Sequence, residues 1–195
     1  MPVNQAHPVP GIVGILLAAG RSDRFGGDKL LAVLPDGECI GASAARHLLT
    51  ALSEVVAVVR PGDAALAAAL TAEGARVIEC AHADKGMGAS LACAVAADPN
   101  ADGWIVALGD MPWIRPATIA AVTTALTAGH AMVAPALDGE RGHPVGFARA
   151  FRSALLALTG DQGARAILAS HRAALHCIPT DDPGVLRDID VVADL

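Results

Sequence analysis

Residues 17–29 read LAAGRSDRFGGDK and directly follow residues 11–16, which read GIVGIL. The apolar run is typical of a buried strand, so the sequence predicts a strand over Ile12–Leu17 that leads into a glycine-rich, cationic loop. Small residues such as Ala18, Ala19 and Gly20 let the backbone approach a ligand closely, which bulky side chains would prevent. Exposed backbone N–H groups in a loop of this kind form a nest that binds anions.

Three cations of this loop, Arg21, Arg24 and Lys29, supply charge for a polyanion such as a nucleoside triphosphate. The loop is not a Walker A motif, because Lys29 is followed by Leu30 instead of a serine or threonine. Its glycine spacing also differs from the GxGxxG fingerprint of dinucleotide-binding folds. The alternative interpretation is an ordinary turn with solvated arginines. The coincidence of strand, glycines and cations favours a nucleotide site.

The length of the chain is typical of one domain. It has 195 residues, and no linker, repeat or charge run marks a domain boundary. Residues 1–10 are polar and proline-rich and lack an apolar stretch, so we expect a short disordered tail there instead of a secretory signal. Residues 11–195 are expected to form a single domain.

Charge and cysteine usage disfavour several classes of protein. The net charge is −6 and the isoelectric point about 5.5, which argues against general binding to nucleic acids. No apolar run approaches the ~20 residues that span a bilayer, so no membrane partner is expected. The four cysteines are scattered without a CxxC pair, which argues against structural zinc and fits a reducing cytoplasm.

The order of apolar runs predicts a fold of the α/β class. Strands are expected at 12–17, 55–59, 76–79, 104–108, 131–137, 144–148 and 175–178, and helices at 43–52, 63–70, 87–97, 116–126, 150–158 and 164–170. Their alternation implies crossover connections and a mostly parallel sheet. Ligands of such sheets bind at the carboxyl ends of the strands. Residues 18–29 and 109–112 both follow strand ends, so both are expected at one crevice.

Carboxylates near two of these ends are candidate ligands of Mg²⁺. Asp110 follows the strand expected at 104–108, within the sequence LGDMP, and Mg²⁺ is usually held by one or two carboxylates together with phosphate oxygens. The alternative is an aspartate that merely starts a turn before Pro112. Asp188 and Asp190 form a second acidic cluster, which either completes the metal site or belongs to a solvated tail.

Three further polar segments are candidates for contacts with substrates. Ser90, in the glycine-rich stretch KGMGASL, is expected to contact a nucleotide or merely to cap a helix. His143, in RGHPVGF, is interpreted as a positioning residue, because an attacking phosphate is already ionised and needs no strong base. Asp161 is expected to cap the helix at 164–170, or to act with Arg165 on a second phosphorylated substrate.

The motifs, in this order, resemble those of the molybdenum cofactor cytidylyltransferase family. The matching stretches are LAAGRSDRFGGDK, GMGASL, LGDMPWIRPATI, RGHPVGF, LTGDQGAR and DPGVLRDID, which extend from Leu17 to Asp190. The first motif is shared with many nucleotidyltransferases of glycosyltransferase-A type. Ala19 stands where related guanylyltransferases typically have a second glycine, and Asp28 precedes Lys29 where sugar-phosphate nucleotidyltransferases usually have proline.

The resemblance implies a three-layer α/β/α sandwich with a mostly parallel sheet, of the glycosyltransferase-A-like nucleotidyltransferase fold. It implies Mg²⁺-dependent transfer of CMP from CTP to molybdenum-loaded molybdopterin. It also implies delivery of the product to an apo-enzyme of the xanthine dehydrogenase type. The family's motif usually continues after DID with Thr-Pro-Glu-Asp, whereas this chain continues with Val191-Val192-Ala193-Asp194.

By resemblance, each candidate residue takes a role. Catalysis falls to Lys29, Arg24 and Asp110, and metal binding to Asp110 and Asp190. The nucleotide would contact Leu17, Ala18, Ala19, Gly20, Arg21, Lys29 and Ser90, and the pterin would contact His143, Asp161 and Arg165. Two alternatives stay open: a nucleotidyltransferase of this fold that uses GTP or another phosphorylated acceptor, and a non-catalytic module that binds a nucleotide or delivers a cofactor.

Overall fold

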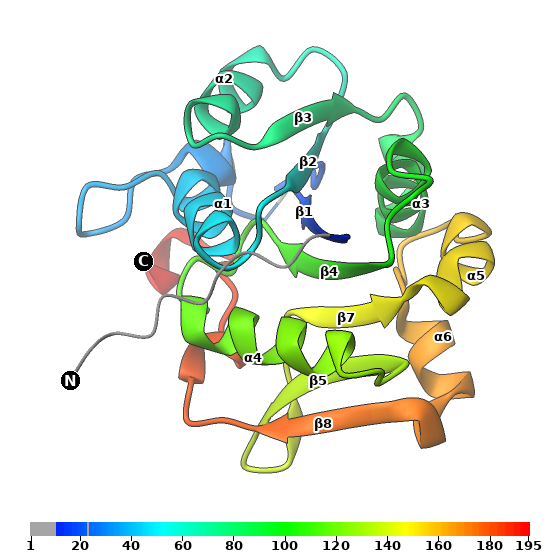
Figure 1. The fold of residues 1–195 in the computed structure, drawn as a ribbon. Coiled ribbons are helices and arrows are strands. Elements are labelled where there is room, and N and C mark those ends of the chain that lie inside the picture. The colour runs from blue at the N-terminus through cyan, green and yellow to red at the C-terminus, as the bar shows by residue number, and fades with distance from the viewer. Residues whose placement is uncertain (1–10, 23) are drawn as a thin grey trace.

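The computed structural model describes residues 11–22 and 24–195, so the tail expected at residues 1–10 lies outside the described residues. The centre of the fold is an eight-stranded mixed sheet with the order β3-β2-β1-β4-β7-β5-β6, in which β8 also pairs with β5 (Figure 1). The strands are β1 (Ile12–Leu17), β2 (Val55–Val59), β3 (Arg76–Glu79), β4 (Gly103–Leu108), β5 (Met132–Leu137), β6 (Glu140–Arg141), β7 (Val145–Ala148) and β8 (Leu175–Pro179).

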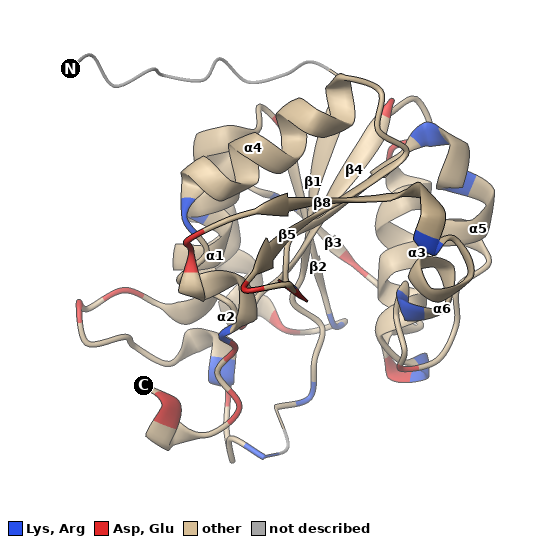
Figure 2. Cartoon of the chain, turned by 90° about the horizontal axis from the view of Figure 1, so that it is seen from below, with Lys and Arg blue, Asp and Glu red and all other residues tan. Residues whose placement is uncertain are grey.

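Helices cover both faces of this sheet. They are α1 (Ile40–Ala51), α2 (Ala64–Ala72), α3 (Met87–Ala97), α4 (Pro116–Thr127), α5 (Arg152–Leu156) and α6 (Arg165–Ser170). Figure 2 shows α1, α2 and α4 on one side of the strands and α3, α5 and α6 on the other. The predicted three-layer α/β/α sandwich is therefore confirmed.

The central strands are apolar throughout because both of their faces are buried. In β1, Ile12 and Leu16 pack into the cluster under α1 and α4, whereas Val13 and Ile15 pack into the cluster under α3 and α5. A strand covered on both faces has no polar alternation, which is typical of parallel sheets between two helical layers. Burial of both faces explains why the apolar run after Gly11 is continuous.

The parallel part of the sheet comprises β1 with β2 and β4, β2 with β3, and β5 with β8. The antiparallel part is formed by β7, which pairs with both β4 and β5, and by the β5–β6 hairpin. The hairpin turns at Asp138 and Gly139, both of which have positive φ. Within the described residues, no helix is long and apolar enough to cross a membrane.

The bounds of two helices, α1 and α5, differ most from the expected ones. Helix α1 begins at Ile40 instead of residue 43, because Ile40 is fully buried and extends the apolar face of the helix toward its start. Helix α5 is limited to residues 152–156 instead of 150–158, because residues 149–151 form a separate 3-10 turn. These differences leave the order of the elements unchanged.

Candidate active site

A cavity of about 590 Å³ opens at the carboxyl ends of β1 and β4. The two strands are parallel neighbours with Leu17 paired to Leu108, so the loops that follow them start side by side. Gly109 permits this closeness: its N–H donates to the Leu17 carbonyl at 3.0 Å, and a Cβ at this position would lie 3.1 Å from Leu30 Cδ1. The expected crevice at the strand ends is therefore present.

The loop after β1 supplies much of the cavity wall, and three of its cations reach the cavity. Residues of this loop in the lining are Ala19, Gly20, Arg21, Ser22, Arg24, Lys29 and Leu30, joined by Leu17 at the end of β1. Ala18 lies outside the lining. Lys29 begins a short 3-10 helix and is 8% exposed, whereas the side chain of Arg24 is 76% exposed. Lys29 is therefore held in place, and Arg24 extends from the surface.

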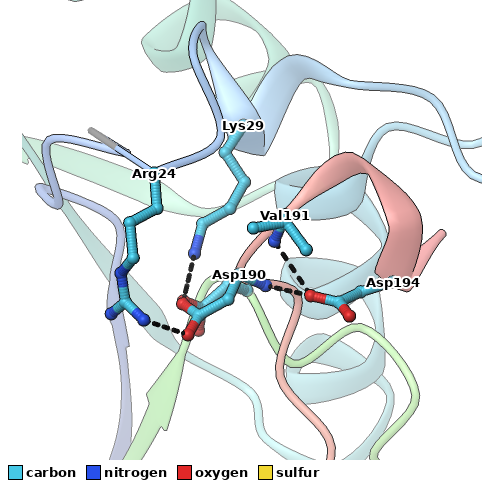
Figure 3. Close-up of polar contacts among 6 residues, drawn as sticks. Arg24, Lys29, Asp190, Val191 and Asp194 are labelled. Carbon is cyan, nitrogen blue, oxygen red and sulfur yellow. Dashed lines mark hydrogen bonds and ion pairs between the residues drawn. The ribbon is translucent and has the colours of Figure 1, made fainter.

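Arg24, Lys29 and Asp110 line the cavity, and the Asp190 carboxylate joins their side chains from outside the lining (Figure 3). Lys29 Nζ lies 2.7 Å from Asp110 Oδ2 and 3.9 Å from Asp190 Oδ1, so the ammonium lies within ion-pair distance of both carboxylates. Arg24 Nη1 lies 2.6 Å from Asp190 Oδ2. The charges of the four side chains sum to zero, which offsets part of the cost of burying Lys29.

The C-terminal segment brings Asp190 to this cluster although it lies 80 residues from Asp110 in the sequence. The Ile189 N–H donates to the Asp110 carbonyl at 3.0 Å, and the Ile189 side chain is fully buried. These contacts connect the segment directly to the loop after β4. Asp188 points elsewhere: its side chain is exposed and makes no ion pair with another described residue. Of the two aspartates, the structure therefore places Asp190 beside Asp110.

A second wall of the cavity comes from the start of α3 and the loop at 159–163. Gly86, with φ +104°, precedes α3, and the Gly88 N–H donates to the Gly160 carbonyl at 2.8 Å. Ser90 lies inside the first turns of α3, is 3% exposed and lines the cavity. The helix begins after Gly86, so Ser90 is not a capping residue.

Asp161 also lines this cavity, together with Asp84. The expected capping role of Asp161 is wrong, because α6 begins after Ala164 and has no side-chain cap. Residues 161–164 form turns before the helix starts, which moves Asp161 away from its first N–H groups. Asp161 instead faces the start of α3, where a Cβ on Gly86 would collide with its carboxylate.

His143 lies near the same edge of the sheet but outside the cavity lining. Val145 pairs with Val106 in antiparallel β4–β7, so His143 stands beside the carboxyl end of β4. Its ring Nδ1 is enclosed without a hydrogen-bond partner among the described residues. Burial, and secondarily the charge of Arg141, lower the pKa of His143 to about 4, so the ring is neutral at pH 7. Arg165 is exposed at the start of α6 and also lies outside the lining.

The donor set of the site fits a divalent cation with oxygen ligands. Asp110 lines the cavity and Asp190 lies outside the lining, and both offer carboxylate oxygens close to the same ammonium group. Within the described part of the chain, no group of three or more His, Cys, Asp or Glu side chains forms a ready-made metal cage. Mg²⁺ is usually held by one or two carboxylates, with substrate phosphates and waters completing its coordination, so a pair is sufficient.

Sequence reasoning missed several lining residues, namely Ala83, Asp84 and Met87 near the second wall and Leu108 at the end of β4. The short 3-10 helix Ala83–Lys85 follows β3, whose carboxyl end lies at the same edge of the sheet as those of β1 and β4. The rule that placed the other two loops at the crevice would therefore have indicated Asp84 as well.

A glycine-rich cationic loop and Asp110 follow the ends of neighbouring parallel strands, an arrangement that resembles the sites of nucleotidyltransferases. The family model of the MobA-like NTP transferase domain matches residues 14–175, so the chain belongs to that family. The match spans every strand from the body of β1 to the start of β8.

Similar proteins cover nearly the whole chain. Purine catabolism protein PucB of Bacillus subtilis is 30% identical over 93% of this chain and 92% of its own length. Nicotine blue oxidoreductase of Paenarthrobacter nicotinovorans is 28% identical over 96% of both chains. The crystal structure of Rv0371c from Mycobacterium tuberculosis has a TM-score of 0.81 at 30% identity and 94% coverage of both chains. The same protein has been solved in complex with manganese, with a TM-score of 0.78 at 27% identity and coverage of 94% and 95%.

Proposed function

We propose that this nucleotidyltransferase transfers CMP from CTP to the terminal phosphate of molybdenum-loaded molybdopterin. An oxygen of the acceptor phosphate forms a bond to the α-phosphorus of CTP, and the bond from that phosphorus to the bridging oxygen breaks. Pyrophosphate leaves, and the product is molybdopterin cytosine dinucleotide. The observation that carries the proposal is that Lys29, in the lining of the cavity of about 590 Å³, lies within ion-pair distance of both Asp110 and Asp190.

The catalytic work of this site is positioning and charge neutralisation, because the attacking phosphate is already ionised. Lys29 and Arg24 donate to triphosphate oxygens and stabilise the negative charge that develops on the leaving pyrophosphate. Arg21 adds charge at the rim of the cavity. Asp110 and Asp190 hold Mg²⁺, which supplies charge neutralisation at the phosphates when bound. A manganese complex of the similar Rv0371c supports a divalent metal.

The nucleoside is placed at the other end of the cavity. The backbone at Leu17, Ala19 and Gly20 approaches the base and ribose, Ala18 lies behind it outside the lining, and the Ser90 hydroxyl donates to one of them. This orientation is supported by charge, because the cations lie in the first loop whereas Asp84 and Asp161 lie at the second wall. Phosphates are repelled from those carboxylates and attracted to Lys29. The cytidylyl assignment rests on Ala19 and on the motifs after β4 and β7.

The pterin is placed beside the carboxyl end of β4, next to the phosphate end of the cavity. His143 is neutral at pH 7, so it contributes a hydrogen bond to the acceptor and not a positive charge. Arg165 supplies charge from α6, and Asp161 contacts the pterin from the loop before that helix. The dinucleotide product then passes to an apo-enzyme of the xanthine dehydrogenase type in the cytoplasm.

The test is release of pyrophosphate by the purified chain with Mg²⁺ and molybdenum-loaded molybdopterin, comparing CTP with GTP, ATP and UTP. The proposal predicts release with CTP, at a rate at least about tenfold above the other three nucleotides. Release with GTP alone would reject the cytidylyl assignment and retain the nucleotidyltransferase. Binding of a nucleotide without any release, with this acceptor or other phosphorylated ones, would support a non-catalytic delivery module.

A further inference from the structure

The four residues after Asp190 fold back on it. Residues Val192–Asp194 form a 3-10 turn. This turn brings the Asp194 carboxylate next to the backbone of Asp190 and Val191 (Figure 3). One oxygen, Asp194 Oδ2, accepts from the Asp190 N–H at 2.8 Å and from the Val191 N–H at 2.9 Å. Both bonds go from successive backbone groups to a carboxylate oxygen, which makes them stronger than bonds to a neutral acceptor.

Without the hydrogen bonds to Asp194, the backbone at Asp190 would be fixed on its N-terminal side only. On its N-terminal side, buried Ile189 is bonded to the Asp110 carbonyl, so the chain is fixed there. On its C-terminal side, Val191 and Val192 are 39% and 60% exposed, and the next residue packed against the core is Leu195, after Asp194. An exposed segment with few packing contacts opens at low free-energy cost. The bonds from Asp194 therefore fix the second side of the Asp190 peptide.

The 3-10 turn at Val192–Asp194 is also connected to the rest of the protein. Arg187 Nη2 donates to the Asp194 carbonyl at 3.1 Å, and the guanidinium carbon of Arg187 lies 3.6 Å from the centre of the Trp113 ring. Trp113 belongs to the loop after β4 that also carries Asp110. Through these contacts, the segment with Asp190 and the loop with Asp110 keep one relative position.

We propose that Asp194 is a positioning residue that holds the Asp190 carboxylate at the metal side of the site. The inference rests on the proposed function, in which Asp190 is a ligand of the divalent cation. Asp194 touches no substrate and acts only through Asp190. Without it, the Asp190 and Val191 N–H groups lose their acceptor, and the carboxylate no longer keeps its distance from Asp110. Outer-shell partners of metal ligands typically contribute 10–100-fold to metal affinity or activity.

The test compares full-length wild type with Asp194→Ala and Asp194→Asn, using Mn²⁺ as the probe. Free Mn²⁺ is measured by electron paramagnetic resonance in the presence of CTP, without acceptor. We expect the Mn²⁺ dissociation constant to rise about tenfold in Asp194→Ala. Asp194→Asn keeps an oxygen that accepts both N–H groups, so its constant is expected between those of wild type and Asp194→Ala. In turnover assays, kcat at saturating metal is expected within about threefold of wild type, with the loss confined to the KM for metal.

Two controls separate positioning from general effects. Asp181→Asn removes one negative charge from a side chain that is 96% exposed and pairs with Arg115, so its Mn²⁺ constant is expected to equal that of wild type. In an Asp190→Ala background, Asp194→Ala is expected to add nothing, because its effect passes through Asp190. An added loss in that background would overturn the inference, as would wild-type Mn²⁺ affinity in a folded Asp194→Ala protein.

The failure of this inference is distinguishable from failure of the proposed function. If wild type binds no Mn²⁺ in the presence of CTP, the metal assignment of the proposed function is wrong. If wild type binds Mn²⁺, Asp190→Ala weakens that binding and both Asp194 variants do not, only the positioning role is wrong. The Asp194→Asn variant keeps the shape of the side chain, so a folding defect of Asp194→Ala does not prevent a decision.

Discussion

Lys29 lies close to two carboxylates that the proposed metal ion also needs. Its ammonium group is 2.7 Å from Asp110 and 3.9 Å from Asp190, and the residue is almost fully buried. An incoming cation must therefore compete with Lys29 for the same oxygens. A triphosphate removes the competition by giving Lys29 new partners. Metal and nucleotide are thus expected to bind cooperatively, each favouring the other.

Lys29→Met tests this exchange because it keeps the length of the side chain and removes the charge. We expect turnover to fall about 100-fold or more, since a donor to the transition-state charge is lost. We expect Mn²⁺ binding without nucleotide to become several-fold tighter, which electron paramagnetic resonance would measure. Lys85→Met, at an exposed position outside the cavity lining, is the matched control. Near-normal turnover of Lys29→Met would refute its proposed role.

Asp110→Asn removes the charge of the other central side chain while preserving its shape. The amide oxygen still accepts from Lys29, so the fold should tolerate the change. A neutral amide is a much poorer ligand for Mg²⁺ than a carboxylate, and pyrophosphate release is expected to fall to background at all Mg²⁺ concentrations. The measurement is a Mg²⁺ titration of turnover. A titration curve that matches wild type would show that Asp110 is not a metal ligand.

At the scale of elements, the start of α3 packs closely against the loop at 159–163 because Gly86 and Gly88, which have no side chain, face that loop. A Cβ on Gly88 would lie 2.7 Å from the Thr159 carbonyl oxygen, and a Cβ on Gly86 would lie 2.6 Å from the Gly160 oxygen. Because this contact brings Asp161 and Ser90 to one cavity, the shape of the second wall depends on it.

Gly86→Ala is expected to displace the loop and raise the KM for nucleotide about tenfold or more. It should also cost about 1–3 kcal/mol in the free energy of unfolding, from positive-φ strain together with the collision. Gly129→Ala is a matched control, because Gly129 has nearly the same φ, +103° against +104°, and open space around it. Gly129→Ala should lose stability from strain alone and keep its KM. Equal KM values in the two variants would contradict the proposed dependence.

Elements that are marked by their own apolar residues and by nearby glycines could be predicted from the sequence. The bounds of β1, β2, β3 and α3 agree with the expected ones, and the loops after β1 and β4 do meet at one crevice. The choice of Asp190 over Asp188 could not be made from the sequence, because it depends on burial of Ile189 against a loop 80 residues away in the sequence. The turns at 161–164 likewise follow from packing on α3, so the capping pattern at Asp161 was misleading.

At the scale of the whole molecule, stability and the proposed site occupy different parts of the sheet. Two apolar clusters, one on each face, hold the helices in place, and the charged side chains of the site lie at the edge where the parallel strands end. His143 belongs to both regions. Its backbone N–H donates to the Val185 carbonyl at 2.9 Å, and its enclosed ring stands beside β4. Its protonation state therefore affects global unfolding.

The pKa of His143 is lowered from an ordinary value of 6.5 to about 4, mainly by burial and further by Arg141, against the opposing effects of a backbone hydrogen bond with Val106 and the charge of Asp188. Between these two pH values, the unfolded chain binds a proton at this histidine and the folded chain does not. The stabilising contribution of the neutral ring is thus complete above pH 6.5 and is lost as the pH falls toward 4. The difference between the two pKa values corresponds to at most about 3 kcal/mol in the free energy of unfolding. Partial access of solvent to the ring reduces this contribution to about 1–2 kcal/mol.

His143→Gln replaces the ring with a side chain that does not titrate. The free energy of unfolding, measured with urea at pH 7.0, 5.5 and 4.5, should decline less steeply with acid in this variant than in wild type. The difference in the free energy of unfolding between wild type and His143→Gln is expected to shrink by about 1–2 kcal/mol from pH 7.0 to pH 4.5. His82→Gln, at an exposed histidine, should give a curve parallel to that of wild type. If the His143→Gln curve is also parallel, then His143 takes up its proton equally in the folded and unfolded states, and its ring is open to solvent.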